Sequence, residues 1–204
     1  GTGRVFSYDW TQLTDWIYLS HSGQMKGQFG YGITLFAEDE FYKSILFEDN
    51  YGLEISFEKS FSKSISFNIK PKFGTEIIRV DAPYQARNTG LGLGIELKPS
   101  DEFKLNFRMD QSKSIRFEND EVVYSDMIAR ARFEYQATTF LNFRLVSQYH
   151  RYYGTFDIQP LISYQPGPFS IFYFGTSRTY DTSFPGWKES YGQIYLKVQK
   201  LFSF

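Results

Sequence analysis

An alternation of apolar and polar residues runs through most of the chain and restricts it to β-strands. Successive side chains of a strand point to opposite faces of the sheet, so an alternating segment has one apolar face and one polar face. In the segment 103–117, the apolar positions begin with Phe103, Leu105, Phe107 and Met109. The same period recurs in 64–73, 124–136, 140–151 and 193–204. The pattern predicts an antiparallel all-β fold.

Eleven strands and their connections can be placed on this basis, within one domain that spans 1–204. The predicted strands are 15–21, 28–37, 51–57, 64–73, 91–97, 103–117, 124–136, 140–151, 158–165, 169–178 and 189–204, with a twelfth within 4–10. Short turns at 60–63, 99–101, 137–139 and 166–168 alternate with longer polar connections at 76–87, 118–121, 152–155 and 179–188. Alternation of short and long connections is typical of outer-membrane β-barrels, which have short periplasmic turns and longer extracellular loops.

The composition excludes several classes of protein. The 204 residues contain no Cys and two His, which excludes disulfides and thiolate chemistry and argues against a transition-metal site. A net charge of −1 with interspersed signs gives no electrostatic attraction for nucleic acid. No run reaches the roughly 18 apolar residues of a membrane helix. We expect neither a cofactor nor a metal.

Two all-β architectures remain, a soluble sandwich and a membrane barrel. A sandwich buries its apolar faces, whereas a barrel turns them to lipid and lines its lumen with the polar faces. Aromatic residues make up 20% of the chain, and girdles at two membrane interfaces account for such an excess better than a soluble core does. We therefore predict an antiparallel up-and-down transmembrane β-barrel in the bacterial outer membrane, or the C-terminal 10 to 12 strands of a larger one.

The last alternating segment ends on an aromatic residue, as the last strands of such barrels do. Val198, Phe202 and Phe204 share one face and form the predicted C-terminal signal through which the barrel-assembly machinery would recognise the chain. The N-terminus lacks the apolar stretch of a signal peptide. We expect the chain to be the C-terminal part of a longer protein.

Charged residues on the polar faces of neighbouring strands form the main candidate site. They are Arg108, Asp110, Arg130, Arg132, Glu134 and Arg144. If they project into one lumen, they would favour anionic solutes. The same residues could instead pair in a structural salt-bridge network that fills a narrow barrel. The sequence leaves both possibilities open.

The other polar motifs are weaker candidates for a catalytic or ligand-binding site. His150, with Ser147 and Asp157 nearby, suggests a hydrolase, but a polar rim histidine is the simpler interpretation because no oxyanion donor can be placed. The acidic clusters 38–40, 48–50 and 118–121 are expected in extracellular loops, either solvated or bound to Ca²⁺ or, through divalent ions, to lipopolysaccharide. The glycines of 90–94 fall within a strand, which argues against a phosphate loop and favours small lumen residues that make room for a neighbour.

A series of motifs between residues 132 and 181 resembles one bacterial family. The motifs are Arg132-Phe-Glu-Tyr-Gln136, Phe140-Leu-Asn-Phe-Arg-Leu-Val-Ser-Gln-Tyr149, Gln159-Pro-Leu-Ile-Ser-Tyr-Gln-Pro-Gly-Pro168 and Phe172-Tyr-Phe-Gly175. In this order they resemble the C-terminal barrel of large outer-membrane proteins whose N-terminal part is a family-9 carbohydrate-binding-like domain. The turn at 166–168 departs from the family pattern. The resemblance implies the fold and the location and transfers no catalytic residue.

These observations predict a role in the outer membrane without catalysis. We expect a structural or interaction subunit of an outer-membrane assembly, in contact with lipid, lipopolysaccharide and other outer-membrane or periplasmic proteins. The alternative is a channel or receptor-like barrel for small anionic or saccharide solutes. An outer-membrane hydrolase is a distant third.

Overall fold

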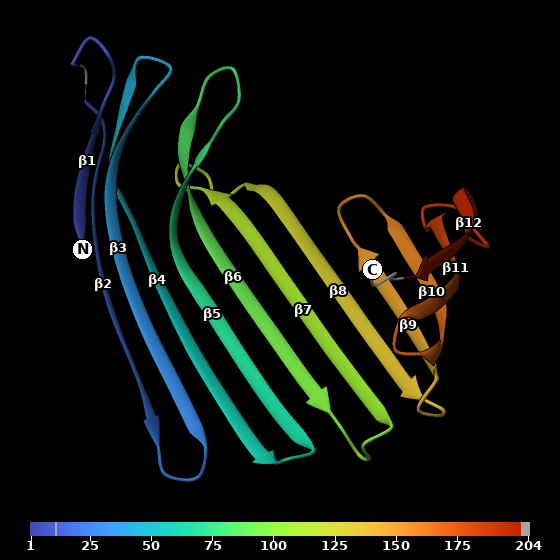
Figure 1. Cartoon of the computed structure of the whole chain (residues 1–204). Coiled ribbons are helices and arrows are strands. Elements are labelled where there is room, and N and C mark those ends of the chain that lie inside the picture. The colour runs from blue at the N-terminus through green and yellow to red at the C-terminus, as the bar shows by residue number, and fades with distance from the viewer. Residues whose placement is uncertain (11, 201–204) are drawn as a thin grey trace. The chain divides into compact units, whose positions relative to one another are not determined.

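The computed structural model describes residues 1–10 and 12–200, and in them every regular element is a strand (Figure 1). The strands are β1 (Thr2–Phe6), β2 (Gln12–Met25), β3 (Phe29–Tyr42), β4 (Ile45–Ser62), β5 (Ile65–Ile78), β6 (Tyr84–Leu97), β7 (Phe103–Arg116), β8 (Val122–Gln136), β9 (Leu141–His150), β10 (Thr155–Gly167), β11 (Ser170–Asp181) and β12 (Lys188–Lys200). They form one antiparallel sheet in sequence order, with β1 and β12 at the two ends of that order. In this part of the chain, no helix is long and apolar enough to cross a membrane.

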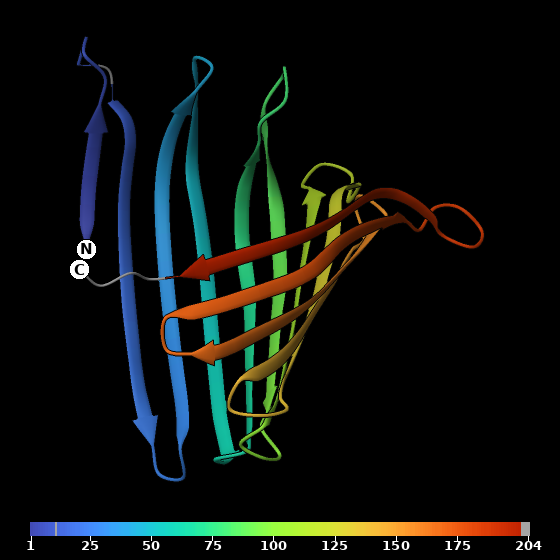
Figure 2. The same ribbon diagram turned by 45° about the vertical axis from the view of Figure 1, so that its right-hand side comes forward.

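The chain divides into two compact units, and each is described by itself. Unit 1 comprises 1–60, 68–93 and 110–126, and unit 2 comprises 61–67, 94–109 and the residues from Met127 onward. Strands β4 to β8 therefore contribute residues to both units. Unit 2 contains β9 to β12 entirely, as a series of neighbouring antiparallel strands (Figure 2). The prediction of a single domain stays a prediction.

All the predicted strands are present, and the up-and-down antiparallel topology is confirmed. The uncertain twelfth strand is β1, which begins and ends slightly earlier than the segment 4–10 predicts. Short turns follow β4, β6, β8 and β10 at the predicted places. Two of the longer connections are shorter than predicted, because strands extend into them: only 79–83 link β5 to β6, and only 182–187 link β11 to β12. The other two, 117–121 and 151–154, lie within one residue of the predicted bounds.

Two of the three acidic clusters lie in strands, which corrects the prediction of loops. Residues 38–40 belong to β3 and 48–50 to β4, and the hairpin turn between these strands is Lys43-Ser44. The register shifts between Glu38 and Glu40, and Asp49 has a positive φ of 58°. The Asp49 N–H donates to Asp39 Oδ1 at 2.9 Å. Polar side chains that satisfy a bulged backbone in this way let a strand continue where composition indicates a loop.

The apolar faces of the strands are exposed, and few apolar side chains are buried. In unit 1, cross-strand register aligns Leu19, Leu35 and Leu53 on β2, β3 and β4, with Leu19 69% and Leu35 48% exposed. In unit 2, register aligns five apolar residues across β8 to β12, namely Tyr135, Phe143, Ile162, Phe174 and Leu196. We call these five the apolar row. Leu196 is 72% exposed and Phe174 55% exposed, so no second layer of the described chain covers the row.

The buried residues are unusually polar. The buried apolar side chains of the described chain are Phe47, Ile77, Ala86 and Val146, whereas the buried polar ones are Asn50, Ser114 and Asp126. In unit 1, Ser114 Oγ donates to the Glu76 carboxylate and accepts from Asn88 Nδ2 at 3.1 Å. Burial of polar groups costs stability unless they are hydrogen-bonded, and each of the three has a hydrogen-bond partner in unit 1. The polar side of this sheet is therefore the better-packed one.

Candidate functional site

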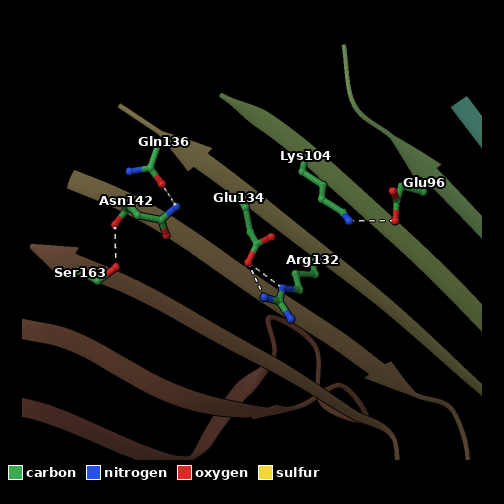
Figure 3. Close-up of polar contacts among 7 residues, drawn as sticks. All are labelled: Glu96, Lys104, Arg132, Glu134, Gln136, Asn142 and Ser163. Carbon is green, nitrogen blue, oxygen red and sulfur yellow. Dashed lines mark hydrogen bonds and ion pairs between the residues drawn. The ribbon is translucent and has the colours of Figure 1, made fainter. Parts of the chain in front are cut away.

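The candidate site is the polar face of unit 2, on strands β6 to β12. Lys104 on β7 and Glu96 on β6 form an ion pair of 3.0 Å, which places both on this face (Figure 3). On the opposite face the rings of Phe103 and Phe133 meet edge to face, with centroids 4.7 Å apart. Residues next to Phe103 and Phe133 in sequence therefore share the polar face. The alternation predicted from sequence is thus present between β7 and β8.

Arg132, Glu134 and Arg144 form the centre of the predicted cluster. Arg132 donates to Glu134 Oε1 through Nε at 3.0 Å and also through Nη2 (Figure 3). Glu134 lies opposite Arg144 in the β8–β9 register. Arg144 Nε is nevertheless buried and has no hydrogen-bond partner among the described residues. Two guanidinium groups therefore flank one carboxylate, and that carboxylate is bonded to Arg132.

The remaining predicted residues are less closely associated. Arg108 and Arg130 are exposed, and among the residues described neither makes an ion pair or hydrogen bond. Asp110 belongs to unit 1, where its Oδ1 lies 3.3 Å from the position of a Cβ on Gly92. Among the described residues, the one ion pair within the predicted cluster is therefore Arg132–Glu134, which lies along a single strand and does not join two strands.

An uncharged hydrogen-bonded series continues the site toward the β8–β9 turn. Asn142 Nδ2 donates to Gln136 Oε1 at 3.1 Å, and Ser163 Oγ donates to the Asn142 carbonyl at 3.5 Å (Figure 3). Gln136 Nε2 in turn donates to the Thr138 carbonyl in the turn at 2.6 Å. These contacts join β8, β9 and β10 on the polar face.

Sequence reasoning missed the aromatic residues on this face. The Tyr195 side chain lies against Gly175, where an added Cβ would be 2.6 Å from the phenol oxygen and 3.0 Å from Leu161 Cδ1. Lys197 Nζ lies 5.9 Å from the centroid of the Tyr173 ring. Alternation assigns Tyr195 and Tyr173 to the polar face but does not reveal their neighbours, because strand register decides which side chains meet.

The polar face of unit 2 carries an excess of positive charge. Its strand segments hold seven cationic side chains and four carboxylates, a difference of +3. The cations are Lys104, Arg108, Arg130, Arg132, Arg144, Lys188 and Lys197, and the carboxylates are Glu96, Glu134, Asp157 and Asp181. Asp157 Oδ1 also accepts a hydrogen bond of 2.5 Å from Thr179 Oγ1. A surface of this charge attracts anions.

The polar residues around the end of β9 do not assemble into a hydrolase triad. Ser147 opposes Ala131 and Ile158, whereas His150 opposes Ile128 and Thr155. The register of β9 is unbroken, so Ser147 and His150 point to opposite faces. The His150 ring packs edge to face against Tyr153, with centroids 4.6 Å apart. This arrangement fits a rim histidine better than a general base.

The acidic clusters and the glycine run have structural roles. Glu40 accepts two hydrogen bonds of 2.8 Å from Arg79, and no group of His, Asp and Glu in the described residues is arranged to hold a metal. Gly90 and Gly92 lie beside lysines of β5, with Lys72 Cβ 3.5 Å and Lys70 Cβ 3.4 Å from their Cβ positions. The glycines therefore leave room for neighbouring side chains, as predicted for small residues.

The predicted C-terminal signal is described only in part. Val198 lies on the apolar face opposite Phe172 and is 58% exposed. Phe202 and Phe204 lie outside the described residues. No family model, curated protein or solved structure matches the chain.

Proposed function

We propose that the chain forms the wall of a β-barrel in the bacterial outer membrane and acts there as a structural or interaction subunit. The apolar row carries this proposal. Its five residues present a continuous apolar strip on five strands of unit 2, uncovered by the described chain. Transfer of such side chains from water to a hydrocarbon environment stabilises a protein by about 1.5–3 kcal/mol each. Contact with lipid would remove this exposed strip from water and so stabilise the protein.

The opposite face supports the same proposal. A strand in a membrane barrel has its polar residues on the lumen side. The ion pairs Lys104–Glu96 and Arg132–Glu134 lie on the polar face of unit 2, which would be that side. The resemblance of 132–181 to an outer-membrane barrel family agrees with this assignment. Its partners would be lipid, lipopolysaccharide, the barrel-assembly machinery through β12 and the C-terminal signal, and other outer-membrane or periplasmic proteins. No catalytic step is part of the proposal.

Two arginine substitutions on β12 test the membrane placement. Leu196→Arg puts a charge on the apolar face, whereas Gln199→Arg puts it on the polar face of the same strand. In lipid vesicles, Leu196→Arg is expected to lower the free energy of unfolding by about 2–4 kcal/mol, the cost of arginine on a lipid face near mid-membrane. Gln199→Arg should change it by less than about 1 kcal/mol. Equal effects, or a protein that stays soluble without detergent, would contradict the proposal.

The interaction role has its own test. The full chain is expressed in a Gram-negative host and purified from outer membranes in a mild detergent. A stoichiometric partner that stays bound through purification is the expected result for an assembly subunit. A protein that always purifies alone would argue against that role while leaving the membrane placement intact.

A second candidate function, an anion-preferring pore, rests on the +3 charge of the polar face. Rings of cationic side chains in a lumen favour anions. Single-channel recordings in planar bilayers test this directly, with Arg132→Ala as the variant and Arg178→Ala, on the other face of the sheet, as the control. A shift of the reversal potential toward cations in Arg132→Ala alone supports the pore. A correctly inserted protein that never conducts would exclude it.

A further inference from the structure

A hollow of about 790 Å³ lies in unit 1, outside the site described above. It is bordered by the β5–β6 connection and by the end of β7 with the first residues that follow. Its walls include Val80, Pro83, Tyr84, Arg116, Phe117 and Glu118. Pockets for small ligands have volumes of about 300–1,000 Å³ and combine apolar walls with a few polar groups. The hollow has the size and the composition of a ligand site.

Charged contacts hold both of its walls in place. Lys43 Nζ donates to the Val80 carbonyl at 3.0 Å, which ties the β5–β6 connection to the turn after β3. At the start of this connection, Arg79 donates to both carboxylate oxygens of Glu40 at 2.8 Å. On the other wall, Arg87 donates to Asp120 at 2.6 Å. The hollow is therefore preformed, which lowers the conformational cost of binding.

Arg116 places a guanidinium group at the wall of the hollow. Its guanidinium carbon lies 4.1 Å from the centroid of the Tyr84 ring, and its Nε is buried without a hydrogen-bond partner. The Glu121 carboxylate is 4.0 Å from that Nε, beyond hydrogen-bond reach. The Arg116 side chain as a whole is 33% exposed and lines the hollow, so a ligand oxygen there can accept from guanidinium donors other than the buried Nε.

The balance of charge around the hollow selects the class of ligand. Glu118 adds a carboxylate beside the Arg116 cation, while Asp81 is occupied by Lys43 at 3.6 Å. An anionic ligand would be repelled by Glu118, and a cationic ligand by Arg116. Hydroxyl groups both donate and accept, so a neutral polyhydroxylated ring can bind the guanidinium and the carboxylate together. Phe117, 49% exposed, offers an apolar surface for the C–H face of such a ring.

We propose that this hollow binds a neutral saccharide through Arg116, Glu118 and Phe117. The sugar could be a free oligosaccharide or the neutral sugars of a lipid-linked glycan, since the chemistry of recognition is shared. This inference does not depend on the function of the polar face of unit 2.

Titration calorimetry on the full chain in a sugar-free zwitterionic detergent tests the proposal. The free probes are maltotriose, cellotriose and mannotriose, and the lipid-linked source is represented by delipidated core oligosaccharide of lipopolysaccharide. Inorganic phosphate and benzoate serve as anionic competitors. Saturable binding of at least one neutral saccharide is expected, and whether a free probe or the core oligosaccharide binds more tightly identifies the source. Phosphate or benzoate should bind at least about tenfold more weakly.

Two variants link binding to the hollow. Arg116→Gln removes a charged donor and should weaken binding by at least about tenfold, while Phe117→Ala, at an exposed position, should weaken it several-fold. Arg178→Gln, in an exposed ion pair of unit 2, is the control and should bind as the parent chain does. No saturable saccharide binding, tighter binding of an anion, or unchanged binding in both variants would overturn the proposal. Vesicle insertion measured on the same preparations separates this result from the membrane placement.

Discussion

Tyr195 on β12 lies over Gly175 on β11, so closely that a Cβ on residue 175 would be 2.6 Å from the phenol oxygen. The two residues are paired in register, and Leu161 on β10 approaches the same Cβ position to 3.0 Å from the other side. The glycine thus leaves room for the Tyr195 side chain to extend from β12 over β11. Aromatic rings placed over cross-strand glycines help to fix strand register.

Gly175→Ala should destabilise the protein because the ring cannot keep its place. Overpacking of a well-packed site costs about 1–3 kcal/mol, and we expect a loss of that size in the free energy of unfolding. Gly167→Ala is the matched control, because no atom lies within 4 Å of the Cβ position there. Urea unfolding in lipid vesicles measures both. Equal stabilities of the two variants would show that Tyr195 moves aside without cost.

Neutralising Glu134 should change the electrostatics of the polar face more than its stability. The Arg132–Glu134 pair is partly exposed, with side chains 45% and 27% accessible, so its contribution to stability is about 0–1 kcal/mol. Glu134→Gln removes the one carboxylate between Arg132 and Arg144 and raises the net charge of the face by one. We expect a stronger preference for anions in reversal-potential measurements, if the protein conducts.

Substitution of Arg132, the other partner of the ion pair, should change the anion preference in the opposite direction. Arg132→Gln frees Glu134 to approach Arg144, which lies opposite it in register. Anion preference should then fall below that of the parent chain. If both variants shift the reversal potential in the same direction, the polar face does not line the conducting path.

The strands and their two faces could be predicted from the sequence, because a period of two is a local property. The assignment of Leu196 and Val198 to one face and of Lys197 to the other requires no knowledge of neighbouring strands. The cluster of Arg132, Glu134 and Arg144 could be placed on one face by the same reasoning. What it could not show is that Glu134 bonds to Arg132 on its own strand, while Arg144 Nε has no hydrogen-bond partner in the part of the chain that the structure describes.

The errors of the sequence analysis have two physical causes. Residues 38–40 and 48–50 look like loops because they are acidic, yet side-chain hydrogen bonds such as Asp49 N–H to Asp39 keep the backbone in a bulged strand. The contacts of Tyr195, and the hollow around Arg116, depend on register between strands and on connections that fold back. Neither is encoded in the alternation of a single segment.

Glu102 gives a prediction for pH dependence. It lies in the β6–β7 connection, where a hydrogen bond from the Ser100 side chain lowers the pKa of its carboxyl below the usual 4.5. A lowered pKa in the folded state means that the hydrogen bond stabilises the protein above pH 4.5 and that this contribution is lost as the pH falls through the folded pKa. Ser100→Ala should therefore raise the pKa of Glu102 toward 4.5, as measured by NMR titration of the side-chain carboxyl carbon.

The control for this titration is Ser62→Ala, in the neighbouring β4–β5 region. The Ser62 hydroxyl accepts a hydrogen bond of 3.0 Å from the Ser64 N–H, a contact that does not involve Glu102. The pKa of Glu102 should stay lowered in that variant. A pKa that is the same in Ser100→Ala and in the parent chain would show that backbone contacts alone lower it.

The hairpin turn Lys43-Ser44 offers a stabilising substitution. Both residues have positive φ, 49° and 65°, as a two-residue turn between β3 and β4 requires. A non-glycine residue in this conformation costs about 1–2 kcal/mol, a cost that glycine avoids. Glycine also increases the entropy of the unfolded chain, which offsets part of this gain. Ser44→Gly should therefore raise the free energy of unfolding by about 0.5–1 kcal/mol. Lys43 must be kept, because its ammonium group donates to the Val80 carbonyl. Ser66→Gly, at the second residue of β5 and with an ordinary strand conformation, should instead lower stability in the same urea titration. A gain in both variants would contradict the assignment of the turn.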